Sequence, residues 1–508
     1  LAISDLIVGV SNDAVNFLNS AVGSKAAPLK ILMLIAAAGV LVGTVFSSGM
    51  MEIARSGVFY PDKFSFADII LIFLAVMITD VVLLDAFNTI GFPTSTTVSL
   101  IFELLGAAVA ISLFKIAGSE ENVPLGEYIN SAKALTVVSG ILVSVIIAFT
   151  VGATVQYITR MIFTFNYEDK LKYLGGLYGG LAITTIIYFI LIKGVKDAAF
   201  MTPTNYQWVK ENSILILMFS FIFITTLLYL INIFFRINIL KIVVLVGTFA
   251  LAMAFAGNDL VNFIGVPLAG YDSFLTFISS PDTNANNLTM ESLNGAVKTP
   301  LIFLLISGVI MVITLYKSRK ARTVIMTEVN LSRQDEGEER FSSTALSRGI
   351  VSFSLGINRF VSRVIPENLK EWMSKRFIPL TKKNKEKNQP AFDQLRASVN
   401  LVVSSALIAL GTSLKLPLST TYVTFMVAMS TSLSDGAWDR ESAVYRITGV
   451  FSVIGGWFFT AISAFTISFV LASLFFYGGV LAIFFMISVA VFMAYRTQRK
   501  SVSLLICS

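Results

Sequence analysis

Carboxylate and carboxamide side chains recur with the same spacing at two places in the sequence. Residues 9–18 match residues 255–264 at five of ten positions, and both copies contain Asn-Asp followed three residues later by Asn. Carboxylate and carbonyl oxygens are hard ligands that suit hard cations, and the two Asn of each copy share one helical face. The candidate cation ligands are Asn12, Asp13, Asn16, Asn258, Asp259 and Asn262.

Both copies lie in or at the end of apolar runs, where a carboxylate is unusual. An aspartate at the centre of a membrane helix costs roughly 2.5–3.5 kcal/mol or more unless it faces a cavity, a partner or a cation. The simpler interpretation is a polar helix end capped by Asn or Asp. Two copies at corresponding positions favour a functional site in which the aspartates bind metal cations or protons.

Hydroxyl groups follow a proline in a second repeated pattern. Residues 92–97 (Phe-Pro-Thr-Ser-Thr-Thr) are echoed by residues 416–421 (Leu-Pro-Leu-Ser-Thr-Thr). Proline favours the first turn of a helix, where the following backbone N–H groups have no partner inside the helix. These groups and the hydroxyls predict an oxyanion site, unless the hydroxyls only bond back to helix carbonyls. The candidate anion-binding residues are Ser95, Thr96, Thr97, Ser419, Thr420 and Thr421.

The two patterns together predict coupling between an anion and a cation. Two carboxylates beside a bound oxyanion repel it strongly in a medium of low dielectric constant. Anion binding therefore requires that protons or metal cations neutralise the carboxylates. This requirement favours a symporter over a passive anion pore.

The elements that position these residues are predicted to be membrane-spanning helices. Of the 508 residues, 55% are apolar and 14% are charged, against roughly 45–50% and 25% in soluble domains. Apolar runs near 20 residues are long enough to cross about 30 Å of hydrocarbon as helices. The sequence thus predicts an all-α polytopic membrane protein. We expect helices near residues 1–20, 31–48, 67–87, 97–116, 134–157, 174–192, 213–235, 239–265, 300–316, 395–412, 420–433, 445–474 and 478–495.

The residue types that are missing exclude several kinds of chemistry. The chain has no His, the commonest general base and metal ligand. Its single Cys, Cys507, excludes an intrachain disulfide and a Cys-rich zinc site. The sequence begins at Leu1 inside an apolar run, so we expect that the first helix has lost residues at its N-terminus.

Charge in the loops predicts the orientation. Residues 317–392 contain 16 Lys and Arg against 8 Asp and Glu, whereas the whole chain carries a net charge of +7. Because cytoplasmic loops are enriched in Lys and Arg, we expect this basic loop and the C-terminus to be cytoplasmic. Within the loop, residues 347–365 form an amphipathic stretch that can lie on the membrane surface. Alternation outward from the loop inverts the two halves relative to each other, as in many secondary transporters.

The repeat also predicts how the chain is divided. Asp13 to Pro93 spans 80 residues and Asp259 to Pro417 spans 158, a difference close to the 76 residues of the basic loop. We expect residues 1–235 to form the first transmembrane repeat. Residues 236–316 begin the second repeat, residues 317–392 are the inserted loop, and residues 393–508 complete the second repeat and the cytoplasmic tail.

The paired G/A-x-N-D-x-x-N and P-x-S-T-T segments resemble those of the PiT family of inorganic phosphate transporters. The resemblance extends to residues 51–55 (Met-Glu-Ile-Ala-Arg) and 456–460 (Gly-Trp-Phe-Phe-Thr), and it makes Glu52 a possible coupling residue. The counterpart of Glu52 in the second half is expected at Met326, and Glu328 lies two residues further on. The sequence departs from the family at Ser11, and at Val98 and Tyr422, where His is frequent.

The resemblance implies a fold of about twelve helices in two inverted repeats with two re-entrant hairpins. It implies sodium or proton symport of inorganic phosphate by alternating access across the plasma membrane, or the inner membrane of a bacterium. Sodium ions are then co-transported, no other cofactor is expected, and the partners are phosphate, the lipid bilayer and a second copy of the chain, without nucleic acid.

Two alternatives concern a different substrate or a different activity. Sulfate is a second tetrahedral oxyanion that a hydroxyl-lined site does not by itself exclude, although only protonated phosphate can donate a hydrogen bond to a carboxylate. An intramembrane enzyme acting on a phosphorylated lipid is disfavoured by the absent His and the mirrored halves, so no catalytic residue is predicted.

Overall fold

The computed structural model describes residues 1–90, 94–119, 123–193, 201–281, 284–295, 299–318, 320–333, 348, 366–378, 389–436 and 440–503. These residues are almost entirely helical, with two isolated β-bridges (Phe59 with Ile129, Ser65 with Thr289) joining loops. The prediction of an all-α protein is confirmed.

The first half of the chain folds into a series of helices joined by short connections. It contains α1 (Ala2–Gly23), α2 (Leu29–Thr44), α3 (Glu52–Ser56), α4 (Phe66–Ile90), α5 (Thr96–Gly118) and α6 (Ser131–Phe163). These are followed by α7 (Glu168–Ile187), a π-helical continuation (Tyr188–Lys193), α8 (Pro203–Glu211) and α9 (Ser213–Phe235).

The second half is also helical. It contains α10 (Ile239–Ser279), α11 (Leu301–Lys317), α12 (Lys320–Leu331), α14 (Glu367–Arg376), α15 (Gln394–Ser413), α16 (Thr420–Ser434) and α17 (Arg440–Ser503). Short 3₁₀ turns occupy Ser47–Met51, Pro61–Lys63, Leu125–Glu127 and Glu291–Asn294.

Each helix expected from the sequence has a counterpart in the structure. The two last expected segments are the two parts of α17, which breaks at Gly479, where φ is 57° and ψ is −150°. This left-handed conformation favours glycine, and the sequence places Gly478 and Gly479 there. The short helices α8, α12 and α14 were not expected because they lack a long apolar run. The amphipathic stretch expected at 347–365 lies outside the described residues apart from Arg348.

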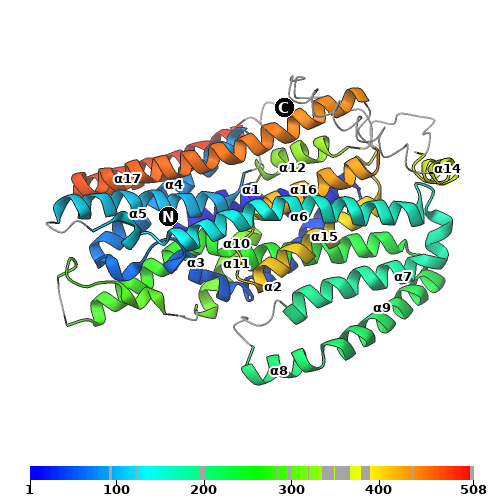
Figure 1. The fold of residues 1–508 in the computed structure, drawn as a ribbon, viewed down its shortest axis with the longest axis horizontal. Coiled ribbons are helices and arrows are strands. Elements are labelled where there is room, and N and C mark those ends of the chain that lie inside the picture. Colours follow the sequence, from blue (N-terminus) through cyan, green and yellow to red (C-terminus); the bar gives the residue numbers. More distant parts are fainter. Residues whose placement is uncertain are drawn as a thin grey trace.

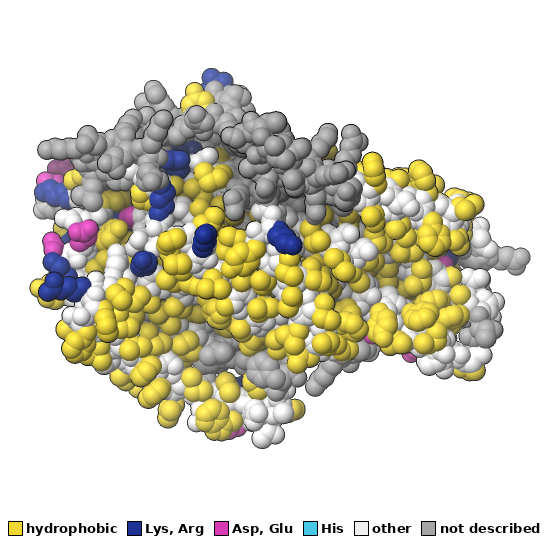
Figure 2. Space-filling view, turned by 180° about the vertical axis from the view of Figure 1, so that it is seen from behind, with side chains coloured by type: hydrophobic (Ala, Val, Ile, Leu, Met, Phe, Trp, Pro, Cys, Tyr) yellow, Lys and Arg dark blue, Asp and Glu magenta, His cyan; other side chains and the backbone are white. Residues whose placement is uncertain are grey.

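The apolar helices are arranged as membrane spans. Among the described residues, eight helices are long and apolar enough to cross a membrane, or up to nine if the bent pair Leu29–Thr44 with Ser47–Ser56 is one span. They run nearly parallel to the long axis (Figure 1). Hydrophobic side chains cover most of the middle of the surface, while charged side chains gather toward one end (Figure 2). The chain is therefore a multi-pass membrane protein.

The centre of the bundle is formed by α1 and α10, which carry the repeated Asn-Asp segments. Both helices are buried along their Asn-Asp segments, and α10 packs against α2 and α15. The approach of α2 to α10 depends on Gly39 and Gly43. A Cβ atom at these positions would lie 2.3 Å from Phe249 O and 2.2 Å from Met253 O. Small residues four apart let two membrane helices approach this closely.

The remaining helices are more peripheral. α17 lies along the upper edge in Figure 1 and packs against α4 and α5. α7 and α9 pack against each other at the lower right, and in α9 only Leu228 is buried. Since α9 is apolar throughout, its exposed face is suited to lipid.

Candidate functional site

Two buried helix starts meet the middles of α1 and α10. α5 begins at Thr96 and α16 at Thr420, directly after the two Pro-x-Ser segments. We call the helix pair α4 and α5 the first hairpin and the pair α15 and α16 the second hairpin. Pro93 lies outside the described residues, whereas Pro417 lies in the extended segment before α16. All twelve site residues expected from the two motifs are at most 3% exposed. The structure therefore brings both pairs of motifs into one buried cluster.

The carboxylate of Asp13 joins the two halves. Thr96 Oγ1, from the same half, donates to Asp13 Oδ2 at 2.9 Å, and Thr421 Oγ1, from the other half, donates to Asp13 Oδ1 at 3.4 Å. One turn further along α1, Asn16 Nδ2 donates to the hydroxyl oxygens of Thr420 and Thr421, each at 3.1 Å. α1 is thus bonded through these residues to the start of α16.

Asp259 makes the corresponding contacts with the halves exchanged. Thr420 Oγ1 donates to Asp259 Oδ2, and Thr97 Oγ1 donates to Asp259 Oδ1 at 3.4 Å. Asn262 Nδ2 donates to Thr96 Oγ1 at 3.1 Å and to Thr97 Oγ1 at 3.0 Å. Each of these contacts of Asp13 and Asn16 therefore has a counterpart at Asp259 or Asn262.

Within the buried cluster, one carboxamide oxygen from each half has no hydrogen bond to the described part of the chain. Asn16 Oδ1 and Asn262 Oδ1 are buried and lack a donor among the described residues. A buried carbonyl oxygen without a donor costs about 1–3 kcal/mol unless another ligand, such as a cation, contacts it. Because each oxygen belongs to a side chain one turn from a carboxylate, the donor set fits two cation positions related by the repeat.

Asn12 holds the first hairpin in place. Its Oδ1 accepts the backbone N–H of Thr94 at 3.1 Å, and its Nδ2 donates to Asn88 Oδ1 at 2.8 Å. Asn88 in turn donates to the carbonyl of Val8 at 2.8 Å. Asn88 thereby ties the end of α4 to α1.

Asn258 holds the second hairpin in a related way. Its Nδ2 donates to the carbonyl of Leu418 at 2.8 Å, and its Oδ1 accepts the hydroxyl of Thr412 at 3.2 Å. Leu418 and Thr412 lie 324 residues after Thr94 and Asn88, the same offset that separates Pro417 from Pro93. Sequence reasoning missed Thr412, although this offset pairs it with Asn88.

The hairpin serines cap their own helices. Ser95 Oγ accepts the backbone N–H of Val98 at 3.1 Å, and Ser419 Oγ accepts that of Tyr422 at 3.2 Å. Each serine therefore has a structural contribution as an N-cap. Its hydroxyl proton is still able to donate to an anion, because a hydroxyl is both donor and acceptor.

The glutamates of the two halves are placed differently. Glu52, at the start of α3, is 42% exposed and accepts Lys415 Nζ at 3.2 Å. It lies apart from the buried cluster. Glu328 on α12 is fully buried and accepts a hydrogen bond from Asn19 Nδ2. Met326, the expected counterpart of Glu52, is 48% exposed.

The Asn19–Glu328 pair is replaced by small residues in the other half. The repeat relates Asn19 to Gly265 and, at the spacing that relates Glu52 to Met326, Glu328 to Ala54. A Cβ at Gly265 would lie 2.8 Å from the Cβ of Ala54, so these two positions also touch. Glu328 thus occupies the position of Ala54 and not that of Glu52.

The arrangement can bind charge of both signs. Two buried carboxylates and two unpartnered carbonyl oxygens are ligands for cations, and the starts of α5 and α16 present N–H groups to an anion. In the structure, the four Thr hydroxyls donate to the carboxylates. The Thr side chains therefore orient the aspartates, which leaves the helix starts and the Ser hydroxyls for the anion.

Membrane-spanning helices packed around a buried cluster of carboxylates, carboxamides and hydroxyls are typical of transporters. The chain belongs to the phosphate transporter family, because the family model (PHO4) matches residues 9–324. This membership confirms the resemblance found in the sequence and makes the protein a transporter.

A solved structure described as "The sodium-dependent phosphate transporter" shares the fold. Its TM-score is 0.60 at 15% sequence identity, and the match covers 93% of this chain and 96% of that chain. No curated protein matches the chain.

Proposed function

We propose that this protein is a symporter that couples the uptake of inorganic phosphate to sodium ions. The observation that carries the proposal is the mirrored pair of unpartnered oxygens, Asn16 Oδ1 and Asn262 Oδ1, each one turn from a buried aspartate. Hard, neutral and anionic oxygens together suit sodium. The name of the structurally similar transporter, which includes sodium dependence, supports the same cation.

Phosphate binds between the starts of α5 and α16 in this proposal. Free N–H groups and the positive ends of two helix dipoles favour an anion there. The hydroxyls of Ser95 and Ser419 add two donors. Sodium must bind at the same time, because Asp13 and Asp259 otherwise repel the phosphate.

Transport proceeds by alternating access between two inverted repeats of about twelve membrane helices and two re-entrant hairpins. The cross-contacts support this, since each aspartate is held by hydroxyls of both halves. A movement of one half relative to the other changes all of these contacts together.

The protein resides in the plasma membrane, or in the inner membrane if the cell is bacterial, as a homodimer. The basic loop 317–392 and the C-terminus face the cytoplasm, because their Lys and Arg content follows the positive-inside rule.

A binding measurement tests the site. We expect purified protein to bind radiolabelled phosphate with an affinity that rises with sodium concentration and not with choline. Asn16→Ala and Asn262→Ala remove one carbonyl ligand each, so the sodium concentration for half-maximal binding should rise about ten-fold, the equivalent of 1.4 kcal/mol. Sodium dependence that is unchanged in both variants would contradict the proposed cation ligands.

A further inference from the structure

A fully buried arginine lies at the end of α15 that is far from the site. Arg396 is 0% exposed, although it stands only two residues into the helix. Thr412, which contacts Asn258, is 16 residues further along α15, or about 24 Å at 1.5 Å per residue. Arg396 therefore lies near the basic loop, on the side that we propose to be cytoplasmic.

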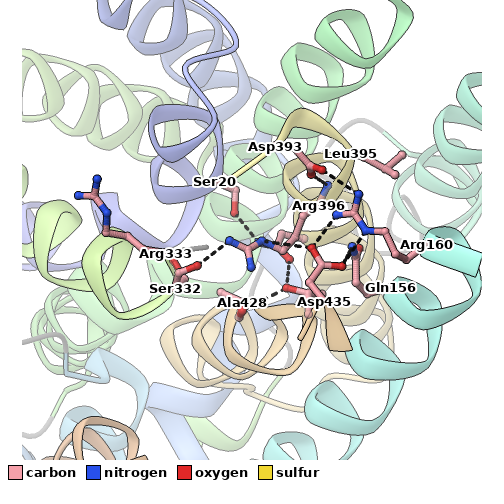
Figure 3. A network of polar contacts seen from close by, with 12 residues as sticks. Ser20, Gln156, Arg160, Ser332, Arg333, Asp393, Leu395, Arg396, Ala428 and Asp435 are labelled. Atoms are coloured by element: carbon pink, nitrogen blue, oxygen red, sulfur yellow. Dashed lines mark hydrogen bonds and ion pairs between the residues drawn. The ribbon is translucent and has the colours of Figure 1, made fainter. Parts of the chain in front are cut away.

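The carboxylates around Arg396 are bonded to a different arginine. Arg160 Nε and Nη2 donate to the two oxygens of Asp435 at 2.9 and 2.6 Å, and Arg160 Nη1 donates to Asp393 Oδ2 at 2.8 Å. Gln156 donates to Asp435 Oδ1 at 2.6 Å. Figure 3 shows both carboxylates directed at Arg160. Asp393, just before α15, has a pKa below its ordinary value, because Arg160 outweighs the opposing effect of burial.

Arg396 retains unpartnered donors in this network. Its Nη2 donates to the carbonyl of Ser332 at 2.6 Å, and its nearest carboxylate oxygen is Asp435 Oδ2, 3.9 Å from Nε. Nε and Nη1 have no hydrogen bond among the described residues. Phe392 covers one face of the guanidinium at 4.5 Å. A buried guanidinium with free N–H groups is costly unless an anion accepts them.

A buried polar seam leads from the site to Arg396. Ser20 lies one turn after Asn16 on α1, and its hydroxyl accepts a hydrogen bond from Asn400 Nδ2 at 3.1 Å. Thr431 Oγ1 donates to Asn400 Oδ1 at 2.6 Å. Asn400 follows Arg396 by one turn and lies on the same face of α15. Figure 3 shows Ser20 on the side of the network that faces α1.

Among the residues that the structure describes, the Arg396 network has no counterpart in the first half. The repeat offset of 324 relates Arg396 to Ile72 and Asp435 to Ile111, and both isoleucines are fully buried. The guanidinium of Arg396 thus has no equivalent at the related position of the first half.

We propose that Arg396 forms a second binding site for an inorganic oxyanion, which phosphate occupies on its way from the central site to the cytoplasm. This inference rests on the proposed function. The site is Arg396 with its free Nε and Nη1, and Asn400 and Ser20 line the approach. Because Arg160 already neutralises the nearby carboxylates of Asp435 and Asp393, the second site binds phosphate without sodium.

Phosphate binding in nanodiscs of zwitterionic lipid tests this site. We expect wild-type protein to bind radiolabelled phosphate in two components, one that requires sodium and one that persists in choline buffer. Arg396→Gln should weaken the sodium-independent component about ten-fold or more, since a charge-assisted hydrogen bond is lost, and leave the other unchanged. Arg396→Lys keeps the charge without the planar fork and should give an intermediate affinity. Arg376→Gln, near the same end of the bundle but over Trp372, is the matched control and should bind like wild type.

The outcomes separate this inference from the proposed function. If wild-type protein binds phosphate only with sodium, or if Arg396→Gln and Arg396→Lys bind it like wild type, the second site is wrong while the symporter proposal stands. If wild-type protein binds no phosphate with sodium, the proposed function fails. Nanodiscs containing an anionic phospholipid identify the source of the anion. Displacement of the sodium-independent phosphate by this lipid would assign Arg396 to a lipid headgroup and overturn the transport role.

Discussion

At the scale of residues, the two aspartates owe their position to partners from both halves. Asp13 and Asp259 are 0% exposed and each accepts two Thr hydroxyls. Neither residue caps a helix end, because both lie in the middle of a long helix. The simpler capping interpretation therefore does not apply, which supports the proposed cation site.

Removal of either carboxylate should abolish coupling. Asp13→Asn and Asp259→Asn keep the side-chain volume but remove a charged cation ligand, so concentrative phosphate uptake should fall at least about ten-fold. Uptake of radiolabelled phosphate into cells with a sodium gradient measures this. Asp169→Asn, an exposed carboxylate on α7, is the control and should not change uptake. Normal sodium-driven uptake in both site variants would mean that the aspartates are structural.

The hairpin serines should affect affinity and stability together. Ser95→Ala and Ser419→Ala each remove an N-cap, which lowers the free energy of unfolding by about 1 kcal/mol, and a donor to phosphate, which raises the apparent KM about ten-fold. Asn130 caps α6 through Lys133 N–H at 3.0 Å and is distant from the hairpins in sequence. Asn130→Ala therefore separates the two effects, because it should lower stability without changing KM. An unchanged KM in both serine variants would leave them as caps only.

At the scale of elements, the sequence predicts the long helices but not the contacts that join them. Apolar runs located the long helices (α1, α2, α4 to α7, α9 to α11 and α15 to α17) because lipid requires about 20 apolar residues per span. The short helices α12 and α14 follow no such rule. Likewise, Thr412 and Asn19 gave no signal of their own, because a single polar residue in a helix has many structural uses. The repeat offset of 324 is what relates Thr412 to Asn88 and exposes its place in the site.

The ion pairs between α6, α15 and α16 should be important for stability. Asp435→Asn removes the bidentate partner of the buried Arg160, and breaking a buried pair costs about 3–5 kcal/mol. Thermal unfolding in detergent should show a clear decrease. Asp68→Asn breaks a partly exposed pair with Lys115 and should cost only about 1 kcal/mol or less. Equal unfolding temperatures for the two variants would show that the Arg160 network does not stabilise the bundle.

At the scale of the whole molecule, the orientation follows from charge alone. Residues 317–392 hold the excess of Lys and Arg, and we expect them on the cytoplasmic side together with the tail. On either side of this loop, the polar contacts of Asp13 and Asn16 correspond to those of Asp259 and Asn262. This correspondence could be predicted from the motifs, whereas the Arg396 network could not, because its positions in the first half are isoleucines.

Labelling of the only thiol tests the orientation. An impermeant maleimide should modify Cys507 in inverted membrane vesicles and not in intact cells. The matched control is Asn286→Cys combined with Cys507→Ser, which moves the thiol to an exposed position in the loop after α10. This variant should label from outside. Labelling of Cys507 in intact cells would reverse the proposed topology.

The central claim, sodium-coupled transport of phosphate, is tested most directly by uptake into proteoliposomes with an imposed gradient. An inward sodium gradient should drive accumulation of radiolabelled phosphate above its external concentration, and Asp13→Asn should abolish this accumulation. Excess sulfate should not compete. Accumulation driven equally well by a proton gradient without sodium, or equal transport of sulfate, would contradict the account.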